Sequence, residues 1–200
     1  NAAYTGSWAK HFSDRVQALG GQVAQPVEYT SGKQAEALTD ALAQALAHKA
    51  DALVIVANAR DTALLAQLLR KQGSTLPLSA AEWAATDQML TMGGRAVEQV
   101  VVAQYFDPNS QQGVYSAFVQ AFKTRFARSP GFAEVAAFDA ATVMLRALAE
   151  QASGESLKQV LLRIKRFEGL QQPVVFDAAG DAPRPLFVTR VVNGQFTVAP

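Results

Sequence analysis

The sequence predicts an α/β protein built on a doubly wound parallel sheet, and three observations lead to this prediction. The chain has 200 residues, 50% of them hydrophobic, so it can bury a core without disulfides. Its first 103 residues alternate between helical and strand patterns with short breaks, as in a series of βαβ units. The run Leu53–Val56 is apolar throughout, which is typical of a parallel strand covered on both faces.

Helical patterns mark four segments of this first part. The first helix is predicted over 5–19, where Trp8 and other apolar residues recur on one face before two glycines end it. A second helix opens at Ser31–Gln34, which has the spacing of a capping box, and a third ends near Gly73. A short helical stretch follows over 87–92.

Strand patterns lie between these helices, at 22–29, 53–56, 76–79 and 100–103. The chain begins on a helix, whereas a doubly wound lobe begins on a strand. We therefore expect that a strand is absent between 22–29 and 53–56, and that either a strand of another chain fills the gap or residues upstream of Asn1 are in evidence. Direct pairing of 22–29 with 53–56 would contradict this order.

The pattern changes after Tyr105. The helix predicted over 132–151 is apolar on nearly every side, with Asp139 and Arg146 as its interior charges, so we expect it to be buried between layers. The remaining elements are helices over 114–127, with an aromatic stripe, and 156–166, then strands over 174–177, 185–192 and 195–198, the last two joined by Asn193-Gly194.

Composition and motifs exclude several classes of function. The 18 basic and 17 acidic residues nearly cancel, which argues against nucleic-acid binding through bulk charge. The absence of cysteine excludes disulfide scaffolds, thiol catalysis and Cys-ligated zinc. No apolar run approaches the length of a membrane span, and the first residues do not resemble a signal peptide. No catalytic set, metal site or cofactor motif stands out, so we expect a protein that is not an enzyme.

Candidate site residues lie where a doubly wound sheet binds ligands, outside the carboxyl ends of its strands. Tyr4 is at the entry to the first helix, Asn58 follows the strand 53–56, and Glu82 with Trp83 follows the strand 76–79. The alternative for Tyr4 and Asn58 is a turn residue with local hydrogen bonds. For Glu82 it is a surface carboxylate before a short helix.

The order of several motifs along the chain resembles one known family. These motifs are Lys49-Ala-Asp-Ala-Leu-Val-Ile-Val56, Tyr105-Phe-Asp-Pro108, Phe138-Asp-Ala140 and Val191-Val-Asn-Gly194. The chain resembles the branched-chain-amino-acid-type (Leu/Ile/Val-binding) solute-binding proteins of ABC importers, which have the type I periplasmic-binding fold. The resemblance covers essentially all 200 residues in collinear order.

The resemblance implies a domain organisation. Family members have two doubly wound lobes that are joined by hinge strands and close on a ligand. Residues 1–103 and 178–200 resemble the second lobe. Residues 104–177 resemble the hinge crossings and the helical part that returns to the first lobe, whose sheet and preceding signal peptide are missing from this sequence.

The resemblance also implies a function and roles for the candidate residues. Tyr4 and Glu82 match positions that face the cleft, with Glu82 as the partner of the ligand's ammonium, whereas Asn58 stands where the family has an aromatic residue. The implied function is capture of a small amino acid or analogue in the periplasm for an ABC permease of the inner membrane. The alternative is the ligand-sensing input domain of a receptor or regulator. The uncovered helices 114–127 and 132–151 imply self-association of this piece.

Overall fold

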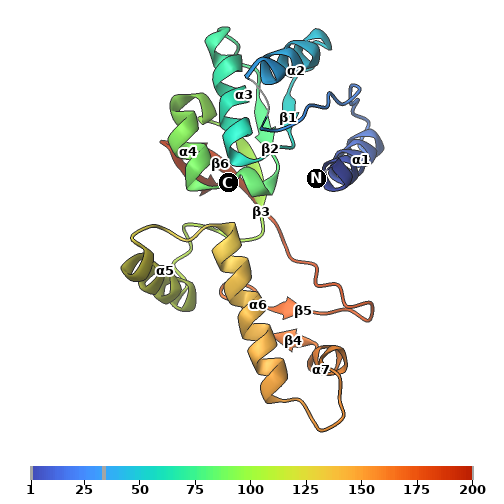
Figure 1. Ribbon diagram of the computed structural model, residues 1–200, viewed down its shortest axis with the longest axis vertical. Coiled ribbons are helices and arrows are strands. Elements are labelled where there is room, and N and C mark those ends of the chain that lie inside the picture. Colours follow the sequence, from blue (N-terminus) through green and yellow to red (C-terminus); the bar gives the residue numbers. More distant parts are fainter. Residues whose placement is uncertain (1, 33–34, 200) are drawn as a thin grey trace. The chain divides into compact units, whose positions relative to one another are not determined.

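The computed structural model describes residues 2–32 and 35–199 (Figure 1). The capping box predicted at Ser31–Gln34 therefore lies partly outside the described residues. The chain forms two compact units. Unit 1 runs to Ala103 and includes Val188–Ala199, whereas unit 2 comprises Gln104–Phe187. Each unit is described by itself.

Unit 1 is organised around a sheet of five strands in the order β1-β2-β3-β6-β7. The pairs β1–β2 and β2–β3 are parallel, which confirms the parallel sheet predicted for this part of the chain. The β6–β7 pair is an antiparallel hairpin across Asn193-Gly194, as predicted. The strands are β1 (Leu53–Ile55), β2 (Leu78–Ala80), β3 (Val101–Gln104), β6 (Phe187–Val192) and β7 (Gln195–Val198).

Among the described residues of unit 1, four α-helices and two 3-10 helices accompany this sheet, and all four predicted α-helices are present. Helix α3 packs against α2 and α4, and its Ala63, Ala66 and Leu69 are fully buried in the core of unit 1. The helices are α1 (Ala2–Ala18), α2 (Ala35–Ala47), α3 (Ala59–Lys71), η1 (Glu82–Ala84), α4 (Asp87–Gly93) and η2 (Gly94–Val97).

The strand predicted over 22–29 is wrong. Residues 21–30, all of which the structure describes, contain neither strand nor helix. A strand is stable only when a neighbour pairs with its backbone N–H and C=O groups, and the segment does not pair with β1, which is an edge of the sheet. Pro26 also lacks an amide hydrogen. The pairing of 22–29 with 53–56 that would contradict the inferred strand order is absent.

Unit 2 contains three helices and a small antiparallel sheet, with α6 alongside β4 and β5 in Figure 1. Its last helix begins at a capping box, in which Ser156 Oγ accepts a hydrogen bond from Gln159 N and Gln159 Oε1 accepts one from Ser156 N at 2.8 Å. Lys165, at φ 63°, ends that helix before a strand that the sequence did not predict. The elements are α5 (Gly113–Phe126), α6 (Phe132–Ala149), α7 (Leu157–Ile164), β4 (Arg166–Phe167) and β5 (Val174–Val175).

The expectation that the helix over 132–151 is buried between layers is wrong for this chain. Helix α6 buries only one face, with Val135, Asp139, Val143 and Ala147. Phe138, Leu145 and Leu148 on the other side are 43%, 68% and 54% exposed, and we call these three residues the α6 face. Arg146, expected in the interior, is also exposed. The cause is the size of the sheet in unit 2, whose two strands of two residues each form a single small layer.

Candidate ligand-binding site

Two candidate residues lie just beyond the carboxyl ends of neighbouring parallel strands. Strand β2 ends at Ala80, and Glu82 opens the 3-10 helix that follows, while Asn58 follows β1. Ala81 N donates a hydrogen bond to Ile55 O at 3.0 Å, which ties the loop after β2 to the end of β1. Open α/β sheets bind ligands outside the carboxyl ends of their strands.

The carboxylate of Glu82 contacts two aromatic side chains of helix α1. Tyr4 Oη donates a hydrogen bond to Glu82 Oε1 at 2.5 Å, and Trp8 Nε1 donates one to Glu82 Oε2 at 3.4 Å. Residues four apart on a helix lie on the same face, so α1 presents both donors to Glu82 together. Each carboxylate oxygen thus holds one neutral donor.

Trp83 completes this group of side chains. Its ring lies 4.4 Å from that of Tyr4, centroid to centroid, with the planes tilted by 35°. Its Nε1 donates a hydrogen bond to Ala57 O, in the loop after β1. Trp83 is partly buried against the core of unit 1. It therefore holds Tyr4 on one side and the end of β1 on the other.

The hydrogen bond to Glu82 makes Tyr4 harder to ionise. This bond, together with desolvation and the nearby negative charge, raises the pKa of Tyr4 to about 12. An ordinary tyrosine has a pKa near 10. Tyr4 is a neutral phenol at physiological pH, as an ordinary tyrosine is, and its raised pKa keeps it a hydrogen-bond donor to the carboxylate in more alkaline solution as well.

Asn58 makes a separate set of contacts, at the start of α3. It is the N-cap of that helix: its Oδ1 accepts from Asp61 N at 2.9 Å, and its Nδ2 donates to Ser31 Oγ at 2.9 Å. Ser31 Oγ donates to the buried carboxylate of Asp61 at 2.5 Å, and Tyr29 Oη donates to the same oxygen at 3.3 Å. The bond to Asp61 N is the local hydrogen bond of the turn alternative. The bonds that involve Ser31 and Tyr29 hold the segment before α2 against α3.

Three of the four predicted site residues, Tyr4, Glu82 and Trp83, are therefore brought together, and Asn58 lies in the neighbouring cluster. The sequence analysis missed Trp8, because its place on the apolar face of the helix already accounted for it. The signal that could have found it is its spacing of four residues from Tyr4. An indole N–H needs an acceptor when it is partly buried, and Glu82 supplies it.

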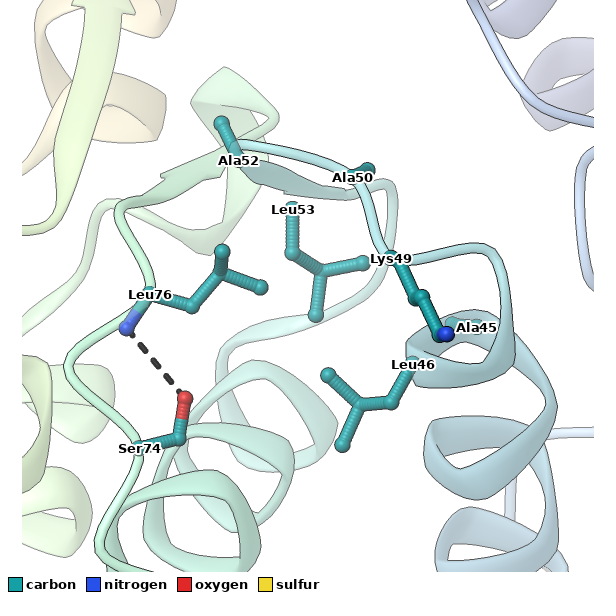
Figure 2. Close-up of a pocket in the computed structure, with 8 residues that line it drawn as sticks. All are labelled: Ala45, Leu46, Lys49, Ala50, Ala52, Leu53, Ser74 and Leu76. Carbon is teal, nitrogen blue, oxygen red and sulfur yellow. Dashed lines mark hydrogen bonds between the residues drawn. The ribbon is translucent and has the colours of Figure 1, made fainter.

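Two pockets elsewhere in the molecule are poorer candidates. The first, of about 120 Å³, lies before β1 and β2, at the amino ends of the strands (Figure 2). Figure 2 shows Leu46, Leu53 and Leu76 pointing toward one another there. Its lining residues are Ala45, Leu46, Lys49, Ala50, Ala52, Leu53, Ser74 and Leu76. Such sheets bind ligands at the opposite ends of their strands, the carboxyl ends.

The second pocket, of about 350 Å³, lies in unit 2 and is mainly apolar, with lining residues that include Val143, Met144 and Phe176. Arg184 is the cationic side chain of this lining. Its Nη1 is 2.7 Å from Oδ2 of the buried carboxylate of Asp139, so its charge is already paired. The pocket therefore offers a ligand apolar surface and no unpaired charge.

Comparison with known proteins identifies the family. The sequence model of the periplasmic binding proteins matches residues 1–195. The chain belongs to the periplasmic binding protein family. A search of the curated proteins found no match. The matched family consists of binding proteins, in agreement with the expectation of a protein that is not an enzyme.

Solved structures of similar fold agree with this assignment. A leucine-binding protein from Thermotoga maritima is 25% identical, with a TM-score of 0.82 over 96% of this chain and 55% of that one. An extracellular ligand-binding receptor from Desulfohalobium retbaense is 26% identical, with a TM-score of 0.79 over 98% of this chain and 34% of that one. A solute-binding protein of an ABC transporter from R. palustris, solved with benzoate, is 16% identical, with a TM-score of 0.79 over 94% and 52%.

The chain thus spans about half the length of the leucine-binding relative. Within residues 2–32 and 35–199, no helix is both long and apolar enough to cross a membrane. In the same part of the chain, no group of three His, Cys, Asp or Glu side chains is placed to hold a metal ion.

Proposed function

We propose that this chain is part of the extracytoplasmic solute-binding component of an ABC importer, and that it binds a small amino acid or related compound. The observation that carries the proposal is the state of Glu82. Its two hydrogen-bond donors are neutral, and none of the ion pairs between described residues includes it. Its negative charge is therefore available to an ammonium group, with which it would form a short, charge-assisted hydrogen bond.

The relatives support a solute of this size without fixing its chemistry. The Thermotoga maritima relative is a leucine-binding protein, whereas the R. palustris relative was solved with benzoate, which has no amine. The carboxylate at Glu82 favours a ligand that carries an amine. Tyr4 and Trp83 supply apolar ring surface beside it, and Asn58 lies one residue beyond the carbonyl that anchors Trp83.

The proposed mechanism is closure of two lobes on the ligand. Residues 1–103 and 178–200 would supply the second lobe, and residues 104–177 the hinge crossings and the returning helical part of the first lobe. Ligand contacts made by both lobes would stabilise the closed state. The proposed partners are the rest of the first lobe and an ABC permease of the inner membrane, with the periplasm as the location.

A sensory function is the second candidate. The likeness to an extracellular ligand-binding receptor, of which this chain covers 34%, favours it. In that case ligand binding at the same site would regulate a signalling domain, whereas in the importer the ligand is passed to a permease. The ligand chemistry would be unchanged.

The test is calorimetry on the two-lobed protein that contains this sequence. The titrants are amino acids and, for each, the matching acid without the amine. We expect heat of binding only for members that carry the amine. Equal binding of the deaminated acids would contradict the proposal that Glu82 recognises an ammonium group.

A further inference from the structure

The N–H and O–H groups of the aromatic side chains around Glu82 already donate hydrogen bonds within the protein. Tyr4 Oη and Trp8 Nε1 donate to the two oxygens of Glu82, and Trp83 Nε1 donates to Ala57 O. None of these three N–H and O–H groups is left to donate to a ligand. The three aromatic side chains therefore offer an incoming molecule mainly ring surface. Tyr4 is 41% exposed and lies against Trp83, while the Trp8 ring is stacked on Phe12 and leaves its other face for a ligand.

The carboxylate has limited room for further donors. An ionised carboxyl group has about four lone-pair sites, and two of those on Glu82 are occupied by Tyr4 and Trp8. A primary ammonium brings three N–H donors, one more than the sites that remain. Because the Tyr4–Glu82 bond is exposed, the third donor is left to water, and the carboxylate gains no bond from it.

An alkylated nitrogen suits these surroundings better. Each N-alkyl group removes one N–H donor, and it spreads the positive charge over a surface that rings attract through their π electrons. Trp is the side chain that binds cations best in this way, and both tryptophans of the sequence, Trp8 and Trp83, lie at this site.

We propose that the Glu82 site selects an N-alkylated ammonium, that is, a secondary, tertiary or quaternary amine, over a primary one, and that Trp8 is a specificity-determining residue. This inference rests on the proposed function and narrows its ligand class. Glu82 supplies the charge, and the rings of Tyr4, Trp8 and Trp83 contact the alkyl groups.

The experiment uses the 200-residue chain and the fluorescence of its two tryptophans, both of which report on this site. The probes are glycine, N-methylglycine, N,N-dimethylglycine and glycine betaine, which differ only in the number of N-methyl groups. We expect N,N-dimethylglycine and glycine betaine to bind about 2- to 30-fold more tightly than glycine. The isostere 3,3-dimethylbutanoate, which has carbon in place of the charged nitrogen, should bind more weakly than glycine betaine.

Two variants test the role of Trp8. Trp8→Leu removes the ring and should bring the affinity ratio of N,N-dimethylglycine to glycine close to one, measured through Trp83. Phe126→Leu, at an exposed ring of unit 2, is the control and should leave the ratio unchanged.

The outcomes separate this inference from the proposed function. Binding of glycine as tight as that of its methylated forms overturns the inference and leaves amine recognition intact. Equal binding of glycine betaine and of the isostere that lacks the ammonium overturns both. The absence of a response to every probe overturns the inference, because it places the selection on this chain alone, whereas the proposed function is tested separately on the two-lobed protein. An unchanged ratio in Trp8→Leu overturns the assignment of Trp8.

Discussion

The two units of this chain differ in what covers their apolar helices. In unit 1 helices α2, α3 and α4 pack in the core around a sheet of five strands, and large side chains such as Leu42, Leu69 and Met89 are buried. In unit 2 the sheet has two strands of two residues, and the α6 face is exposed although its residues are just as apolar. The difference shows that an apolar stripe becomes core only where a second layer is present to receive it.

The exposed surface of unit 2 is therefore its distinguishing property. Besides the α6 face, Val114 and Phe126 of α5 are 66% and 52% exposed. Contiguous apolar surface of more than a few hundred Å² commonly marks a binding interface. In unit 1 the large hydrophobic side chains that are exposed, Tyr4, Leu19 and Val188, lie apart along the chain, in α1, just after its end and in β6.

The largest expected effect is the difference in the free energy of unfolding that is lost when a buried and an exposed leucine are each replaced by alanine. Leu69→Ala, in the core of unit 1, should lower the free energy of unfolding by about 2–5 kcal/mol, because it removes buried contacts and leaves a cavity. Leu145→Ala, on the α6 face and 68% exposed, should change it by less than about 0.5 kcal/mol. Urea unfolding at one protein concentration measures both, and equal losses would contradict the contrast between the units.

Self-association is the next effect. We predict that this chain forms dimers or larger assemblies through unit 2, because burial of the α6 face against a second copy removes apolar surface from water. Leu145→Glu should shift sedimentation profiles toward the monomer at a given concentration. Leu19→Glu is the matched control, since Leu19 is 69% exposed and lies in unit 1. A wild-type chain that stays monomeric at high concentration would refute the prediction.

A smaller effect concerns the tyrosines, two in each unit. The pKa of Tyr4 is raised to about 12 chiefly by its bond to Glu82, whereas burial is the main cause of the rise to about 12 for Tyr105 and Tyr115. Burial beside Asp61 also raises the pKa of Tyr29. Because these folded values exceed the ordinary value of about 10, the neutral phenols stabilise the fold below that pH. This contribution falls as the pH rises from about 10 to about 12.

The absorbance of tyrosinate measures this titration directly. The folded chain should show little tyrosinate at pH values where free tyrosine is half ionised. Glu82→Gln should lower the pKa of one tyrosine, in unit 1, and leave the two of unit 2 unchanged. Ionisation of all four near pH 10 in a folded chain would mean that these contacts do not form.

The sequence predicted those elements whose stability depends on local pattern. The run Leu53–Val56 is apolar throughout, and it forms the parallel strand β1, while the spacing Ser156 to Gln159 forms a capping box. The segment 22–29 has a strand pattern but no strand, because its backbone finds no neighbour. The prediction that α6 is buried between layers was wrong for a similar reason. The sequence of a helix does not show whether a second layer is present to cover its other face.

The candidate site shows the same division. Topology alone placed Tyr4, Glu82 and Trp83 near the carboxyl ends of the strands, and the structure brings them into contact. Trp8 escaped prediction because its place on the apolar face of the helix already accounted for it, although its Nε1 donates to Glu82. Asn58 was placed correctly after β1, and its bond to Asp61 N is a local N-cap, but its bond to Ser31 joins positions 27 apart that no local motif connects. The role of these residues in ligand binding stays a prediction.

The central claim is that the carboxylate of Glu82 anchors an amine, and calorimetry on the two-lobed protein with Glu82→Gln tests it most directly. The substitution keeps the shape of the side chain and removes its charge. We expect it to weaken binding of the preferred amine by about 2–5 kcal/mol, or roughly 30- to several-thousand-fold. The fold should be retained, since Glu82 lies in the short 3-10 helix after β2 and outside the buried core of unit 1. An unchanged affinity for the amine in this variant would contradict the claim.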